Sequence, residues 1–197
     1  MITSRFPVAL LCAVLAAVPA GPALSADAPS KPPAAQKAIR ESARFLEAVE
    51  PLVRAYAQNA RQYSSDPGPG SSWYGRKLEL DLSKLPQPQS AEDKELHRVF
   101  GELLRYRESF FNSHRLAFEE GERLMTEENR SNPAVRFGLI GLGATLGQSY
   151  KRWREYHGYL VPIAEKRFGL LLPRLPFPPY LAKIQAYTKE PAPAGEK

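Results

Sequence analysis

The sequence predicts an all-α protein, a bundle of about three long kinked helices with a long proline- and glycine-rich loop and a short C-terminal helix. Two observations support this fold class. Apolar residues recur at spacings of three and four residues through three long stretches, which is the period of an amphipathic helix. Residues that cap helices stand at the start of two of these stretches. The one run that alternates apolar and polar residues has no obvious partner strand, so a sheet is not expected.

Residues 1–26 have the layout of a secretory signal peptide. An apolar block at 6–18 is followed by helix-breaking prolines and a glycine and then by small residues. The block is shorter than the roughly 20 residues that a membrane-spanning helix needs. We therefore expect cleavage after Ser25 or Ala26, and a mature protein that is periplasmic or secreted. Residues 27–35, rich in Pro and Ala, are expected to form a flexible lead-in.

Composition limits the chemistry of the mature chain. Cys12 is the only cysteine and lies in the apolar block, so cleavage leaves no disulfide, thiol nucleophile or cysteine-bound metal. A lipid anchor on Cys12 is not expected, because Leu10 and Leu11 stand where small residues are needed. Loss of Arg5 takes one cation from a formal net charge of +6 and leaves +5. This mild basic bias favours anionic partners such as lipid headgroups, envelope polymers or an acidic protein. Nucleic acid is not expected outside the cytoplasm.

The helical domain is expected over residues 36–187, and its first helix has one apolar stripe. Pro51 within this helix predicts a kink or a break near Glu50, because proline removes a backbone donor and crowds the preceding turn. A long loop follows at 64–90, in which alternating leucines at 78–82 could form a short extended piece. The stripe of the first helix consists of Ile39, Leu46, Val49, Val53, Tyr56, Ala60 and Tyr63.

The second helix is predicted from Ser90 to about Asn129. Ser90 can cap its start, and Asp93 three residues later approximates a capping box. A seven-residue apolar repeat gives it the seam of a coiled coil, and its length would be on the order of 55 Å. We expect the first helix to be its partner in an antiparallel pair. The repeat consists of Leu96, Val99, Leu103, Tyr106, Phe110, Ala117 and Leu124.

The third helix is predicted to begin at Asn132-Pro133, with Asn as the cap and Pro at the first helical position. It should continue to about Arg167, and Pro162 should bend or end it. A short helix is expected at 180–187, followed by a disordered tail at 188–197. The residues expected on the apolar side of the third helix are Phe137, Leu142, Leu146, Tyr150, Trp153, His157 and Leu160.

Four glycines between Gly138 and Gly147 leave two structural interpretations open. Gly141-x-Gly143 after an apolar run is similar to the first turn of a dinucleotide-binding unit. However, the spacing to the third glycine is one residue too long, and too few residues follow for a doubly wound sheet. We therefore expect no nucleotide or other cofactor. The glycines either let the helix approach a neighbour closely or mark a local break.

Histidine and carboxylate spacings assign no metal site and no catalytic residue. His97, His114 and His157 are the only histidines, and no two have the spacing of a zinc or di-iron half-site. An enzyme with an unorthodox site near His114 is therefore the weakest of three functional hypotheses.

Two segments are candidates for contact with a partner. The long loop carries two aromatic residues, and loops of this length often bind something. The segment 150–159 interleaves cations with aromatics, a composition that suits headgroups or sugars. The candidate partner-binding residues are Trp73, Tyr74, Lys151, Arg152, Arg154, Tyr156 and Tyr159. The leading hypothesis is an exported non-catalytic protein that binds another envelope macromolecule, as an adaptor, chaperone or toxin-neutralising partner. The alternative is a peripheral membrane or cell-wall binder that uses the basic aromatic helix face.

Overall fold

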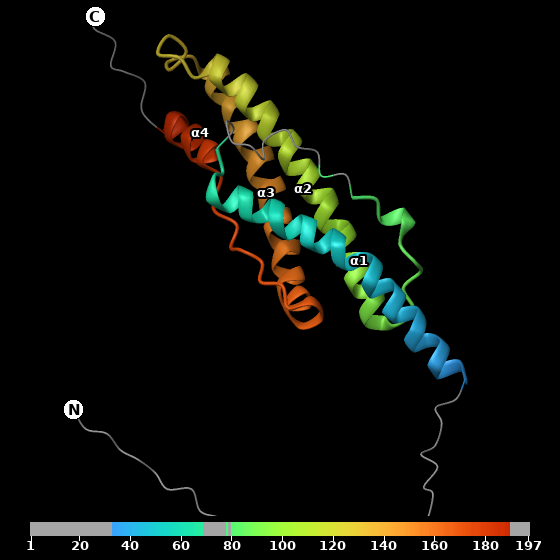
Figure 1. Cartoon of the computed structure of the whole chain (residues 1–197). Coiled ribbons are helices and arrows are strands. Elements are labelled where there is room, and N and C mark those ends of the chain that lie inside the picture. Colours follow the sequence, from blue (N-terminus) through green and yellow to red (C-terminus); the bar gives the residue numbers. More distant parts are fainter. Residues whose placement is uncertain (1–32, 69–77, 79, 190–197) are drawn as a thin grey trace, which may run out of the picture. The chain divides into compact units, whose positions relative to one another are not determined.

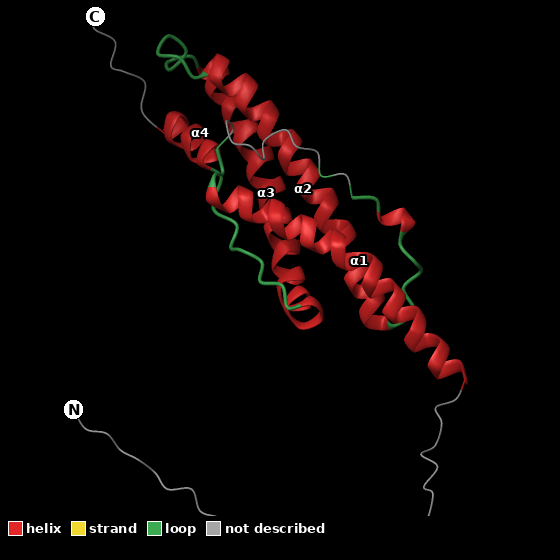
Figure 2. Ribbon diagram, in the orientation of Figure 1, coloured by secondary structure: helices red, strands yellow, loops and turns green. Residues whose placement is uncertain are grey.

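The computed structural model describes residues 33–68, 78 and 80–189, and this part of the chain is all-α, as predicted (Figures 1 and 2). It contains no strand within these ranges. The predicted signal peptide and the aromatic residues Trp73 and Tyr74 lie outside the described residues. The four α-helices are α1 (Pro33–Ser65), α2 (Ala91–Leu124), α3 (Pro133–Phe168) and α4 (Pro179–Lys189).

The starts of α2 and α3 confirm the predicted caps. The Ser90 hydroxyl accepts a hydrogen bond from the Asp93 amide at 3.0 Å, and the Asp93 carboxylate accepts one from the Ser90 amide. The Asn132 side chain accepts from the Ala134 amide at 3.0 Å, next to proline at the first helical position. α3 ends at Gly169, whose φ of 61° is left-handed and therefore suits glycine.

Several predicted boundaries are wrong by a few residues. α1 begins at Pro33, inside the stretch predicted as a lead-in, and α4 continues to Lys189, inside the predicted tail. α2 ends at Leu124 and not near Asn129, because the Asn129 side chain donates to the Leu124 carbonyl and closes the helix end. Glutamates beyond this point would oppose the helix dipole, which favours the turn that follows.

Neither internal proline ends its helix, which corrects the expected break near Pro51 and the alternative that Pro162 ends the third helix. Both prolines are exposed, and the helix assignment is continuous through each. A carbonyl that loses its helical partner on an exposed side can bond to water, so the cost of the proline is reduced there.

The main packing partner of α2 is α3, and the two helices are antiparallel. Phe110 in α2 stacks on Trp153 in α3 with ring centroids 4.9 Å apart. Near the start of α2, Glu92 forms an ion pair with Arg167 near the end of α3. The antiparallel direction follows from the short turn between the two helices. A turn of this length cannot carry the chain back to the start of α2 before α3 begins.

The predicted antiparallel packing of α1 on α2 is wrong, because the two helices run in the same direction (Figure 1). Ser42 bonds to Asp93, and further along both helices Asn59 bonds to Arg107. The connection from 66 to 90 explains this arrangement. A chain of that length can span up to about 80 Å, whereas the helix from Ser42 to Asn59 rises only about 26 Å. The loop therefore has ample length to bring the chain back to the other end of α1.

α1 and α4 cover successive parts of one buried stripe on α2. The N-terminal part of the stripe packs on α1, and the C-terminal part packs on Tyr180 of α4. Gly143 and Gly147 of α3 face Ile184 and Leu181 of α4, and a Cβ added at Gly143 would lie 3.2 Å from Ile184. Close helix packing is therefore correct for these two glycines, and there is no break in α3.

The leucines at 78–82 pack partly buried against the core. The predicted extended piece is only partly described, and Leu82–Lys84 forms a single 3-10 turn. These leucines still place the returning chain against the bundle.

Candidate binding surface

Side chains of α1 and α3 hold the proline-rich segment 170–178 by its backbone carbonyls. Tyr63 donates to the carbonyl of Pro176 at 3.2 Å, and Tyr150 donates to that of Leu175 at 3.1 Å. Proline has no backbone N–H to donate, so this proline-rich segment cannot form the hydrogen bonds of a regular helix. Its carbonyl oxygens accept hydrogen bonds from side chains of the bundle instead.

A buried chain of hydrogen bonds ends on the same segment. The Trp153 indole donates to the Tyr56 hydroxyl at 3.2 Å, and this hydroxyl lies 2.7 Å from Nδ1 of His157. The other ring nitrogen of His157 lies 2.8 Å from the Pro173 carbonyl. Since a carbonyl only accepts, Nε2 carries the proton and Nδ1 accepts from Tyr56. Burial lowers the pKa of His157, which favours this neutral form.

Three of the sequence-predicted residues line one shallow hollow on the outer side of α3. Lys151, Arg154 and Tyr159 surround Gly158, together with Glu155, and the open volume is about 440 Å³. Gly158 adds no side chain to this hollow, and a Cβ built there would meet no described atom within 4 Å. The sequence prediction thus placed these three residues on one accessible surface.

The other two described candidates, Arg152 and Tyr156, contact different groups. Arg152 pairs with Glu155 at 3.2 Å, so its charge is largely balanced. Tyr156 packs on Tyr106 of α2, with ring centroids 5.1 Å apart. Glu155 also accepts from Tyr159 at 3.0 Å, and this hydrogen bond raises the pKa of Tyr159.

Arg154 and Arg174 each lie close enough to Tyr150 to affect its pKa, where the proline-rich segment packs on α3. Burial raises the pKa of Tyr150, and the charges of the two arginines act in the opposite direction. Phe177 lies edge-on to Tyr150 at 5.9 Å and is 51% exposed. Sequence reasoning missed Arg174 and Phe177, because a segment without helical period gives no indication of which side chains face outward.

Arg61 of α1 contacts the start of the same proline-rich segment. Its guanidinium donates to the carbonyl of Leu171 at 3.2 Å, and the Leu171 side chain is 69% exposed. None of the four cations on this side forms an ion pair with a carboxylate in the described ranges, in contrast to Arg152. We call this surface the basic face; it consists of Arg61, Lys151, Arg154, Arg174, Leu171 and Phe177.

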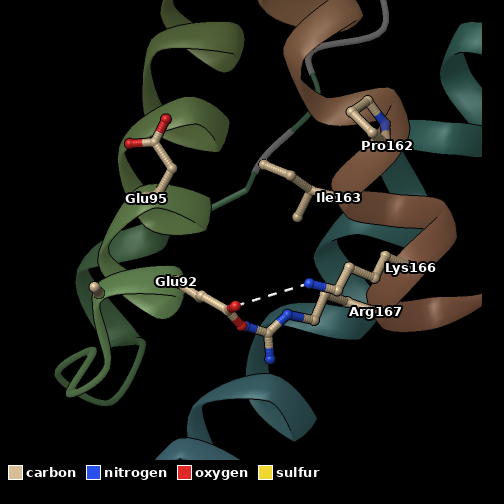
Figure 3. A pocket seen from close by; sticks show the side chains of 7 residues that line it. Glu92, Glu95, Pro162, Ile163, Lys166 and Arg167 are labelled. Carbon is tan, nitrogen blue, oxygen red and sulfur yellow. Dashed lines mark hydrogen bonds and ion pairs between the residues drawn. The ribbon is translucent and has the colours of Figure 1, made fainter.

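A second hollow lies between the start of α2 and the end of α3 (Figure 3). It measures about 380 Å³, and Pro162 and Ile163 contribute much of its apolar wall. Glu92 spans it by pairing with Lys166 at 3.7 Å and with Arg167. This hollow shares no lining residue with the basic face; Glu92 pairs across it, and Glu95 pairs with Arg98 on its own helix.

His114 lies in the core and not on a surface. Its ring is fully buried between Phe110 and Tyr180, and burial lowers its pKa to about 4. A substrate could reach it only if α4 moved. Arg107, two turns earlier in α2, is also buried and donates to Asn59 at 2.9 Å. Among the described residues no three His, Cys, Asp or Glu side chains are grouped to hold a metal ion.

The class of protein that the fold defines is an all-α bundle of three long helices and one short one. None of the helices in the described part combines the length and apolar character needed to cross a membrane. Comparisons with models of protein families, with characterised proteins and with solved structures found no match to this chain.

Proposed function

We propose that this chain is an exported, non-catalytic protein that binds another envelope protein through the basic face. The observation that carries the proposal is that the basic face combines two features. Its cations form no ion pair with a carboxylate in the described ranges, and large apolar side chains are exposed beside them. Arg154 and Arg174 provide charge, and Leu171 and Phe177 provide apolar area at 69% and 51% exposure. Arginine and aromatic residues are enriched where protein interfaces are strongest.

The chemistry of this face favours a partner with acidic groups around an apolar spot. Burying a side chain such as Phe177 or Leu171 contributes roughly 1.5–3 kcal/mol when it is fully removed from water. The cations would increase the association rate and exclude basic partners, and this part of the effect falls as salt screens it. An adaptor, chaperone or toxin-neutralising role would each use such a face.

The proposal is tested by capture from envelope extract with matched charge reversals. In one variant Arg154→Glu and Arg174→Glu alter the basic face. In the control, Arg105→Glu and Arg115→Glu make the same change of net charge on exposed parts of α2. We expect the wild type and the control to retain one acidic partner protein and the first variant to lose it. Equal recovery by both variants would contradict the proposal.

Export is a separate part of the proposal and rests on residues 1–26. Mass spectrometry of the protein from the envelope or medium should find a mature N-terminus at Ala26 or Asp27. A chain that still begins at Met1 and remains in the cytoplasm would exclude this part.

A peripheral membrane or cell-wall binder is the second candidate function, and the exposed Leu171 and Phe177 beside cations favour it. Such a pattern suits an interface with anionic lipid. Sedimentation with vesicles that contain phosphatidylglycerol separates the two candidates. Partition that is lost at moderate salt, and lost in Phe177→Ser, supports the membrane; a wild type that stays in solution excludes it.

A further inference from the structure

A second surface, on the N-terminal part of α3, is apolar and is left exposed by the described part of the chain. Phe137 is 81% exposed and Ile140 is 52% exposed, and Gly141 and Ala144 are exposed on the same side. Residues 137–150 include no charged residue. We call Phe137, Ile140, Gly141 and Ala144 the apolar face of α3.

Phe137 was expected in the core, and the structure corrects this prediction. The inward direction of α3 is occupied by Leu139, Gly143 and Leu146, which are buried against the rest of the bundle. At 100° per residue, Phe137 then lies on the opposite side. An exposed Phe and Ile on an uncharged helix face mark a contact surface more strongly than single apolar residues do.

The shape of the apolar face suits a second copy of itself. If two α3 helices pair antiparallel with a two-fold axis at Gly141, residues equally far from Gly141 on either side face one another. Phe137 of one copy then lies level with Thr145 of the other and next to its Ala144, so a large side chain meets small ones. At the axis, Gly141 meets Gly141, which permits close approach of the two backbones.

The same register matches charges beyond the apolar face. Lys151 comes level with Ser131 of the second copy, in the turn before its α3 that also contains Glu128. Both Lys151 and Glu128 are exposed, and neither has an ion pair within the part of the chain that the structure describes. The neighbouring charges are already matched, since Glu127 pairs with Arg130. By symmetry the contact between Lys151 and Glu128 occurs twice.

We propose that the apolar face is the interface of a symmetric antiparallel dimer, α3 on α3, between two copies of this chain. Of the basic face, only Lys151 takes part in this contact. Arg61, Arg154 and Arg174 lie outside it, so the inference does not depend on the proposed function. The stretch over which the two helices pair, 133–149, is about 24 Å long. One helix pair of this length is at the low end of specific interfaces, so the dimer is in reversible equilibrium with the monomer.

Cysteine crosslinking tests both the face and the direction of pairing. With Cys12→Ser as background, Gly141→Cys and Gly158→Cys each introduce one thiol on α3. They are matched sites, since an added Cβ at either would have no described neighbour within 4 Å. Residue 158 lies about 25 Å from the axis, so its two copies would be about 50 Å apart, whereas a disulfide needs Cα atoms about 4.4–6.8 Å apart.

Under mild oxidation by oxidised glutathione, we expect Gly141→Cys to form a disulfide-linked dimer and Gly158→Cys to remain monomeric. No dimer with Gly141→Cys, or equal crosslinking of both variants, overturns the proposal. Equal crosslinking would indicate a parallel pair or random collision.

Analytical ultracentrifugation of charge-reversed variants tests the register. Lys151→Glu and Glu128→Lys should each raise the dissociation constant of the dimer about tenfold, and the double variant should recover the wild-type value. Phe137→Ser, which alters an exposed side chain, should abolish dimerisation without unfolding the protein. A wild type that stays monomeric at about 100 µM, or a double variant weaker than either single one, overturns the proposal.

Discussion

His114 is expected to make the stability of this fold depend on pH near pH 5. Burial lowers the pKa of His114 from 6.5 to about 4, and its ring is fully buried. The unfolded chain therefore binds a proton at a pH where the folded protein does not. The stability that depends on the neutral ring is fully present above pH 6.5 and is lost as the pH falls toward 4.

The magnitude follows from the pKa difference between the two states. A shift of about 2.5 units corresponds to about 3 kcal/mol once both states are protonated. At pH 5 the loss has reached about 2 kcal/mol, a large part of the usual 5–15 kcal/mol of stability. Burial also lowers the pKa of His157, so its contribution has the same sign and adds to the slope of the wild type.

Urea unfolding at pH 7, 6 and 5 measures this slope. His114→Leu should retain about 2 kcal/mol more of its pH 7 stability at pH 5 than the wild type does. The control is Ala117→Gly, one turn away on the same buried stripe, which should lower stability by about 1 kcal/mol at every pH. If the wild type and His114→Leu lose stability in parallel between pH 7 and 5, the assigned role of His114 is wrong.

Three further tests address close packing, a buried hydrogen-bond network and a helix cap. Gly121→Ala would place a Cβ 2.5 Å from the Tyr180 hydroxyl, whereas a Cβ added by Gly138→Ala would meet no described atom within 4 Å. In thermal unfolding, we expect Gly138→Ala to be more stable than Gly121→Ala by about 2 kcal/mol. Tyr56→Phe removes the hydroxyl that joins two buried side chains and should cost about 1–3 kcal/mol in urea unfolding; an unchanged midpoint would refute the network. Asn132→Ala should cost about 1 kcal/mol and Asn132→Gly only a few tenths; equal losses would show that the cap bonds contribute nothing.

The candidate surface could be predicted only in part from the sequence. The mixture of cations and aromatics at 150–159 led to Lys151, Arg154 and Tyr159, which the structure places around one hollow. Arg174 and Phe177 could not be found in this way. They belong to a segment without helical period, and their exposure depends on hydroxyl groups of α1 and α3 that hold its carbonyls.

The fold class and most helix limits follow from the sequence alone, because caps and the apolar period act within a few residues of chain. The Ser90 and Asn132 caps are local hydrogen-bond requirements, and the structure retains them. The tertiary structure alone decided that α1 runs parallel to α2 and that α4 covers the remaining part of the stripe. A long connection leaves the direction of a helix free, and the period of a stripe says that a face will be covered without saying by which helix. The exposure of Phe137 has the same cause, because the face of α3 that becomes buried depends on where α4 docks.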